Sequence, residues 1–175
     1  NPISLTATNA TLTNATSTDA LTLTVSAGTV AASDLKALDA KTSIDVDADV
    51  AGITITGNAA DVKTVLAATT IDRAADVIVN VSGTVSAADA NTIALAAGTG
   101  VVTATVAAGT AASLKAALTD TDTNALTLKV TGTAAAADLK ALNDKTLTDV
   151  DASKVTAITG TLAEVTAALL AGVDT

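Results

Sequence analysis

Apolar and polar residues alternate with period two in six short runs along the chain, and β-branched residues are frequent in all of them. Alternation of this kind predicts half-buried β-strands. The six runs are residues 21–25 (LTLTV), 53–56 (ITIT), 77–81 (VIVNV), 101–106 (VVTATV), 126–130 (LTLKV) and 155–159 (VTAIT).

An alanine-rich segment follows each run, with apolar residues at positions i, i+3 and i+4, and this spacing predicts a short helix. One position near the start of the helix aligns all six segments, at spacings of 27, 28, 24, 25 and 26 residues. A cap residue three positions before an acid, as in Thr161 and Glu164, predicts a capping box, so we interpret these acids as structural. The aligned residues are Asp34, Asp61, Asp89, Ser113, Asp138 and Glu164.

Residues 28–48 return almost intact at residues 132–152, with 15 of 21 positions identical, which marks a repeat array. The sequence therefore predicts an α/β fold over residues 20–175, built from about six strand-helix coils of 24–28 residues. We expect a right-handed α/β solenoid with one parallel sheet and a shape like that of leucine-rich repeats.

The core of this fold should contain only small aliphatic side chains. We expect helix positions to be buried against strand positions. The helix positions are Leu35, Leu38, Val62, Leu66, Ile93, Leu114, Leu118, Leu139, Leu142, Val165 and Leu169, and the strand positions are Leu21, Leu23, Ile53, Ile55, Val79, Leu126 and Leu128.

Residues 1–19 do not fit the repeat and are rich in Thr and Asn. Alternating Ile3, Leu5 and Ala7 predict a strand, so we interpret residues 1–19 as an N-terminal cap or a donor strand; the alternative is a frayed tail. Solenoids need polar caps, and the last predicted strand, with Val155 and Ile158, leaves an open edge. We therefore expect copies of the chain to join end to end, or the chain to be a segment excised from a longer array.

Composition excludes several classes of function. The chain has no His, Cys, Met or aromatic residue and a formal net charge of −9. The absence of His and Cys removes Ser-His-Asp and Cys-His nucleophile systems and the ordinary zinc sites, so we expect no enzyme and no small-molecule substrate. The acidic charge argues against nucleic acid as a partner, and no apolar run is long enough to insert into a membrane.

Five acids of the predicted return loops are candidate metal ligands: Asp45, Asp47, Asp49, Asp149 and Asp151. Stacked loops would bring their carboxylates into neighbouring layers, and calcium accepts six to eight such oxygens. The loops lack the glycine and the terminal glutamate of an EF-hand, so the alternative is that these acids are solvated.

Threonines occupy the outward positions of several predicted strands. Strands stacked in register would place them in a flat ladder with about 4.8 Å between layers. Such ladders resemble those of ice-binding solenoids, which predicts, as an alternative function, an ice- or glycan-binding adhesin module. The residues are Thr22, Thr24, Thr54, Thr56, Thr103, Thr105 and Thr127.

The repeat, with its ADLKAL helix, KT-x-x-DVDA loop and ITGT turn, resembles the Ala, Thr and Asp-rich tandem repeats of very long secreted or surface proteins of bacteria, notably cyanobacteria. The resemblance covers residues 20–172. It implies a secreted or cell-surface location and a structural or adhesive role, with no catalytic residue to carry over. We therefore expect a non-catalytic, self-assembling module of a bacterial surface layer, sheath or filament.

Overall fold

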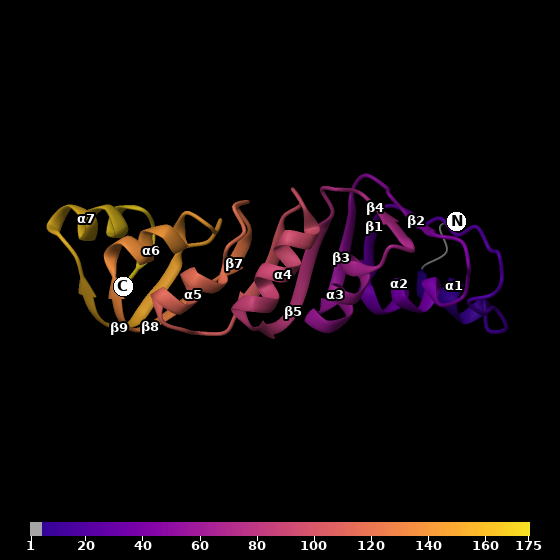
Figure 1. The fold of residues 1–175 in the computed structure, drawn as a ribbon, viewed down its shortest axis with the longest axis horizontal. Helices are drawn as coiled ribbons and strands as arrows, with labels where there is room; N and C mark the ends of the chain where they lie inside the picture. Colours follow the sequence, from indigo (N-terminus) through magenta and orange to yellow (C-terminus); the bar gives the residue numbers. More distant parts are fainter. Residues whose placement is uncertain (1–4) are drawn as a thin grey trace. The chain divides into compact units, whose positions relative to one another are not determined.

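A computed structural model describes residues 5–175, which form an α/β fold of seven helices and ten strands (Figure 1). The chain divides into two compact units. The first comprises Asn1–Ser82 and Ala96–Gly100, and the second comprises Gly83–Leu95 and Val101–Thr175.

In the first unit, three parallel strands lie in the order β1 (Gly28–Ala31), β3 (Ile53–Asn58) and β5 (Ile78–Val85), whose last three residues belong to the second unit. Thr54 is aligned with Thr29 on one side and with Ile78 on the other. Two short parallel strands, β2 (Val46–Ala48) and β4 (Ile71–Arg73), form a separate pair. The alternation of buried and exposed residues along β3 matches the period expected of a half-buried strand.

Three helices complete the first unit: α1 (Leu5–Thr11), α2 (Ala32–Asp39) and α3 (Ala59–Ala67). Figure 1 shows them side by side, and both α2 and α3 contact β3. Leu35, Leu38 and Val62 are buried between the helices and the sheet. The core therefore lies between one helical layer and one strand layer, and small aliphatic residues fill it.

The second unit contains α4 (Ala87–Ala97), whose last two residues belong to the first unit, then β6 (Val102–Val106), α5 (Ala111–Ala117) and β7 (Ala125–Thr127). The chain continues through β8 (Lys129–Ala135), α6 (Ala136–Asn143), β9 (Val150–Thr159), α7 (Leu162–Leu170) and β10 (Val173–Asp174). Strand β6 pairs with β7, and β9 lies between β8 and β10, all in parallel. Helix α6 packs between α5 and α7.

Four of the six predicted strands are confirmed in position, and the fifth, residues 126–130, is divided between β7 and β8. All six predicted helices are present with the aligned acid or Ser113 in the first turn. The predicted caps are also present. The Asn58 side chain accepts a hydrogen bond from the Asp61 amide at 3.0 Å, and Thr161 and Glu164 form a reciprocal capping box. Cap residues and apolar spacing therefore agreed at the starts of α3 and α7, whereas α2 and α6, which begin after Ala31 and Ala135 with no side-chain cap, were located by apolar spacing and the first-turn acid.

Three expectations about the strands are wrong. The described strands fall into three sheets rather than one. Residues 21–25 form no strand and pair only through a bridge between Thr24 and Asp47, because residues 28–31 take the place beside β3. The predicted return loops contain strands of their own, β2 and β4, which pair with each other outside the two larger sheets.

Residues 5–11 were expected to continue a strand and instead form α1. The Asn9 side-chain amide donates to the Asp34 carbonyl oxygen at 2.9 Å, so packing against α2 favours the helix over the local preference of Thr and Asn. Residues 1–4, including Ile3, lie outside the described residues.

Most of the predicted core is confirmed. The exceptions lie at the two ends of the repeat array, where Leu21, Leu23 and Val165 are half-buried and Leu169 is exposed. Leu21 and Leu23 precede β1, and Val165 and Leu169 lie on α7, which packs against α6. The buried predicted residues are Leu35, Leu38, Val62, Leu66, Ile93, Leu114, Leu118, Leu139, Leu142, Ile53, Ile55, Val79, Leu126 and Leu128.

Candidate functional site: the coil-to-coil contacts and the exposed face of α7

The candidate metal ligands of the first unit are exposed and already hydrogen bonded in part. Asp47 accepts from the Thr24 hydroxyl at 3.4 Å and from the Asp49 amide at 3.2 Å, and it is aligned with Asp72 of the neighbouring strand. Asp45 is exposed as well. Within residues 5–175, no group of three or more acidic side chains is arranged to hold a metal ion.

In the second unit, Asp151 forms an ion pair with Lys129, with Nζ and Oδ2 2.7 Å apart, and accepts from the Ser153 amide at 2.9 Å. The hydrogen bond from Lys129, with those from Ser153, holds the pKa of the Asp151 carboxyl well below its usual value. Asp149 is exposed beside Gly172. The strand register therefore pairs Asp151 with a lysine instead of collecting the acids into one site.

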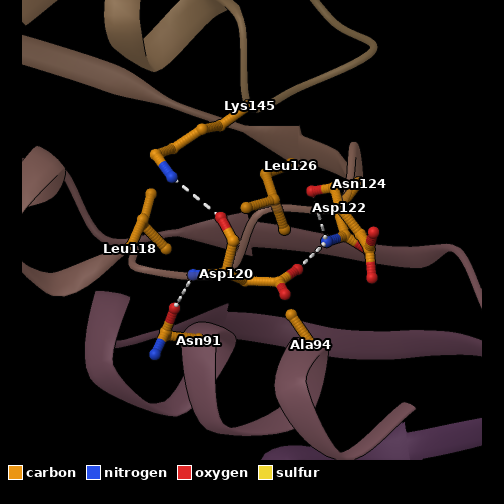
Figure 2. Close-up of a pocket in the computed structure, with 8 residues that line it drawn as sticks. All are labelled: Asn91, Ala94, Leu118, Asp120, Asp122, Asn124, Leu126 and Lys145. Atoms are coloured by element: carbon orange, nitrogen blue, oxygen red, sulfur yellow. Dashed lines mark hydrogen bonds between the residues drawn. The ribbon is translucent and has the colours of Figure 1, made fainter. Parts of the chain in front are cut away.

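A small cavity lies beside the loop that precedes β7, as Figure 2 shows. The Asp120 carbonyl oxygen accepts from Lys145 Nζ at 2.8 Å, its amide donates to Asn91 at 2.9 Å, and its carboxylate accepts from Asn124 at 2.8 Å. Leu118 and Leu126 line the apolar part. The cavity volume, about 10 Å³ for the centre of a water-sized sphere, is room for one water molecule at most.

A shallow hollow of about 80 Å³ lies in the first unit beside the turn that precedes β3, lined in part by Val50, Gly52 and Asp76. Binding sites for small molecules usually enclose about 300–1,000 Å³. Neither this hollow nor the cavity beside Asp120 therefore has the dimensions of a substrate pocket.

The Lys-Thr pair that both repeat copies share has a structural use that the sequence did not reveal. Thr42 is buried, and its hydroxyl donates to the Leu21 carbonyl oxygen at 2.6 Å and accepts from the Leu21 amide at 3.1 Å. Lys41 Nζ donates to the Leu12 carbonyl oxygen at 2.8 Å. Both side chains, which follow α2, thus bind the backbone of the segment between α1 and β1.

The second copy of the pair makes the same contacts in the second unit. The hydroxyl of buried Thr146 donates to the Leu126 carbonyl oxygen at 2.6 Å and accepts from the Leu126 amide at 3.0 Å, while Lys145 binds Asp120 as described above. Asn124, also buried, accepts from the Val102 amide at 2.8 Å. Identical residues at a separation of 104 positions were the signal that could have identified this role.

Ion pairs join neighbouring helices and were also missed from sequence. Lys36 of α2 pairs with Asp61 of α3, and Lys115 of α5 pairs with Asp138 of α6 at 2.7 Å. The pKa of Asp61 is lowered, chiefly by the hydrogen bond from Lys36. The first-turn acids Asp61 and Asp138 thus bind a lysine of the preceding helix, in addition to stabilising the start of their own helix.

The predicted threonine ladder is not formed as expected. Thr22 and Thr24 belong to no strand, and Thr54 and Thr56 are aligned with Ile78 and Asn80 on the β5 side. In the second unit Thr105 is aligned with Thr127, but Thr103 is aligned with Ala125. Short rows of threonines replace the flat threonine ladder on which the ice- or glycan-binding alternative depended. Thermal hysteresis with ice-crystal shaping by the purified protein would restore that alternative.

The outer side of α7 exposes large apolar side chains. Leu162 is 84% exposed, Leu169 is 45% exposed and Leu170 is 83% exposed. We call Leu162, Thr166 and Leu169 the α7 face, because the equivalent positions of α2 and α6 include the residues that contact the next repeat. Scattered exposed leucines are ordinary, but three on one helix make its outer side a candidate interaction surface.

Strand β9 lies beside α7 and has one open edge within the described part of the chain. Strand β10 pairs only with Val150 and Asp151, so residues 152–159 of β9 have β8 on one side and no strand on the other. Val155 and Ile158, predicted for self-assembly, lie on this edge and are half-buried. Leu5 and Ala7, predicted to supply the partner strand, are in helix α1 instead.

Comparison with protein-family models, with curated proteins and with solved structures found no match to this chain. No helix in residues 5–175 is long and apolar enough to cross a membrane.

Proposed function

We propose that this chain is a non-catalytic structural module whose copies assemble end to end, and that its repeats stack as a right-handed α/β solenoid. The observation that carries the proposal is the exposed α7 face together with the open edge of β9. Burial of one exposed leucine side chain contributes about 1.5–3 kcal/mol, and an open strand edge offers unpaired backbone donors and acceptors. Surfaces of both kinds favour addition of a further layer.

The internal contacts support a mechanical role. Thr42, Asn124 and Thr146 each use a buried side chain to bond the backbone of a residue 20–22 positions earlier in the chain. Such bonds join segments that are neighbours in the structure and distant in the sequence. They are the bonds expected of a stack of repeats, in which stability depends on nearest-neighbour interfaces.

We place the module in a secreted or cell-surface layer, sheath or filament of a bacterium. The resemblance of the repeat to those of long bacterial surface proteins supports this location. The net charge of −9 favours solubility and repulsion between acidic surfaces, so association uses the apolar α7 face.

Sedimentation velocity over a wide range of concentration, with electron microscopy of the same samples, tests the proposal. We expect the weight-average mass to rise from the 16.8 kDa of one chain to that of open-ended assemblies. We also expect deletion of residues 1–18 to abolish assembly. A protein that stays monomeric at high concentration would show the proposal to be wrong.

A further inference from the structure

Three segments of the chain match the pattern Asn-x-Ser/Thr, in which the asparagine side chain is the acceptor of an N-linked saccharide. The pattern recurs by chance in a chain rich in threonine, so the sequence by itself does not distinguish the three. The structure does, because it places the three asparagines in a helix, a turn and a strand. The segments are Asn9-Ala10-Thr11, Asn14-Ala15-Thr16 and Asn80-Val81-Ser82.

Asn9 lies in helix α1 and takes part in its packing. Its side-chain amide donates to the Asp34 carbonyl oxygen at 2.9 Å, and its side-chain oxygen is buried. The amide nitrogen that would carry a saccharide is therefore already bonded to α2. A saccharide on this nitrogen would separate the two helices, so the folded chain does not offer Asn9 as an acceptor.

Asn80 is exposed, but it lies within strand β5. It is aligned with Thr56 of β3, and Ser82 of the same segment is aligned with Asn58. The backbone of the whole acceptor segment is thus held in a parallel ladder. An enzyme that encloses this segment would first have to pull it out of the sheet, so the folded chain does not offer Asn80 either.

Asn14 lies in an exposed turn between α1 and residues 21–25. The turn is closed by a hydrogen bond from the Ala15 amide to the Leu12 carbonyl oxygen at 3.3 Å, which places Asn14 near its tip. Asparagine is a favoured residue in such turns. Within residues 5–175 the Asn14 side chain makes no hydrogen bond, so its amide nitrogen is free in the folded chain.

The rest of this acceptor segment is also accessible. Thr16, whose hydroxyl completes the pattern, is exposed, and that hydroxyl donates to the Asp19 carboxylate at 3.1 Å. An exposed hydrogen bond contributes little net free energy, so an enzyme can replace it. The turn is fixed at its base, where Lys41 Nζ donates to the Leu12 carbonyl oxygen at 2.8 Å, while residues 13–16 belong to no helix or strand.

We propose that Asn14 is the residue at which the folded chain accepts an N-linked saccharide. The donor is a saccharide joined through a diphosphate to a lipid carrier. Asn14 Nδ2 forms a bond to C1 of the saccharide, the bond between C1 and the diphosphate oxygen breaks, and the lipid diphosphate leaves with the electron pair. A base of the transferase takes the amide proton. Such acceptors belong to secreted chains, so use of the site rests on the proposed secreted or cell-surface location.

Transfer to the purified, folded chain tests the site. Protein made in a host that does not glycosylate is incubated with an oligosaccharyltransferase that recognises Asn-x-Ser/Thr and with its lipid-linked donor. A short peptide that contains Asn-Ala-Thr shows that the transferase is active. We expect intact-mass spectrometry to show one saccharide per chain and tandem mass spectrometry to place it on Asn14. Modification of the peptide without modification of the folded chain would show that the pattern at Asn14 is a chance match and would overturn the inference.

Matched variants separate the three segments. Asn14→Gln and Thr16→Ala each destroy the pattern in the exposed turn, and we expect transfer to fall at least tenfold in both. Thr16→Ser keeps a hydroxyl at this position and should retain transfer. Thr11→Ala and Ser82→Ala destroy the other two patterns without replacing an asparagine and should leave transfer unchanged, with circular dichroism to check that each variant folds. Transfer that persists in Asn14→Gln would place the acceptor elsewhere and would also overturn the inference.

This inference and the proposed self-assembly fail separately. The mass of the chain reports the saccharide, whereas sedimentation velocity of the unmodified chain reports association. Because the transfer reaction uses purified protein, its result does not depend on where the chain is located. A chain that is modified at Asn14 and stays monomeric keeps the acceptor site and loses self-assembly, and a chain that assembles without being modified does the reverse.

Discussion

The side-chain oxygen of Asn124 accepts the backbone amide hydrogen of Val102 at 2.8 Å, with Asn124 only 2% exposed. A buried side chain of one repeat thus satisfies a strand donor of the repeat before it. Its amide group is engaged as well, by Asp120. Every polar group in this contact has a partner because both residues are withdrawn from water.

Asn124→Ala leaves the Val102 amide buried without an acceptor. We expect the free energy of unfolding to fall by about 1–3 kcal/mol. Urea unfolding followed by far-ultraviolet circular dichroism measures this, since the chain has no aromatic residue for fluorescence. Asn80→Ala, at an exposed strand position, is the control and should change the free energy by less than about 0.5 kcal/mol.

Thr42→Val and Thr146→Val each keep the side-chain shape and remove a buried hydroxyl that serves both an amide and a carbonyl. We expect each change to cost about 1–3 kcal/mol and the two to be alike, because the hydrogen bonds are the same in both copies. Thr127→Val, on an exposed strand position, should be neutral or slightly stabilising. A neutral result at Thr42 or Thr146 would show that these bonds do not hold the repeats together.

Gly100→Ala should be among the most damaging single substitutions in the first unit. A Cβ at this position would lie 2.0 Å from the Val77 carbonyl oxygen, so the backbone has to move. Gly83→Ala is the comparison, because its Cβ would meet open space but its φ is +77°, so only backbone strain is added. We expect it to lower the free energy of unfolding by about 1 kcal/mol. Thermal melts of the two variants should therefore differ, with Gly100→Ala melting lower.

Acid should weaken the second unit through Asp151. The pKa of its carboxyl is lowered in the folded chain, so the ionised form stabilises the fold. This contribution is fully present above the unfolded pKa, about 3.9, and is lost as the pH falls below it. We expect Asp151→Asn to melt lower than wild type at pH 6 and to approach it near pH 2, whereas Asp76→Asn, an equal change of net charge, should not show this convergence.

Calcium should leave the melting temperature unchanged, because Asp47 and Asp151 already accept hydrogen bonds. A variant with Asp45, Asp47, Asp149 and Asp151 all replaced by Asn provides the comparison. A calcium-dependent rise in wild type that this variant loses would instead establish a metal site at these acids.

The helices were predictable because several local signals agree at each one. At Thr161 the cap residue, Glu164 three positions later and the apolar spacing all point to the same start. The strands were less so, because residues 21–25 and 28–31 both have apolar residues at alternate positions. Which of two such runs pairs with Ile53 is decided by register across the sheet, which a single sequence does not contain.

The candidate site was predictable in location and not in detail. The open edge at Val155 and Ile158 follows from the position of the last strand in the array. The exposure of the α7 face was missed because Leu169 fits the apolar pattern of a core helix. Leu162 stands where α2 to α6 each begin with an alanine, and this difference is seen only once the bounds of the helices are known.

The hydrogen bonds of Thr42, Asn124 and Thr146 all run from a later residue to an earlier one. During synthesis, the backbone groups of Leu21, Val102 and Leu126 leave the ribosome before the side chains that bond them have been made. Each newly emerged repeat is therefore completed by its successor, so the chain should fold in the order in which it is translated, one repeat behind the growing end.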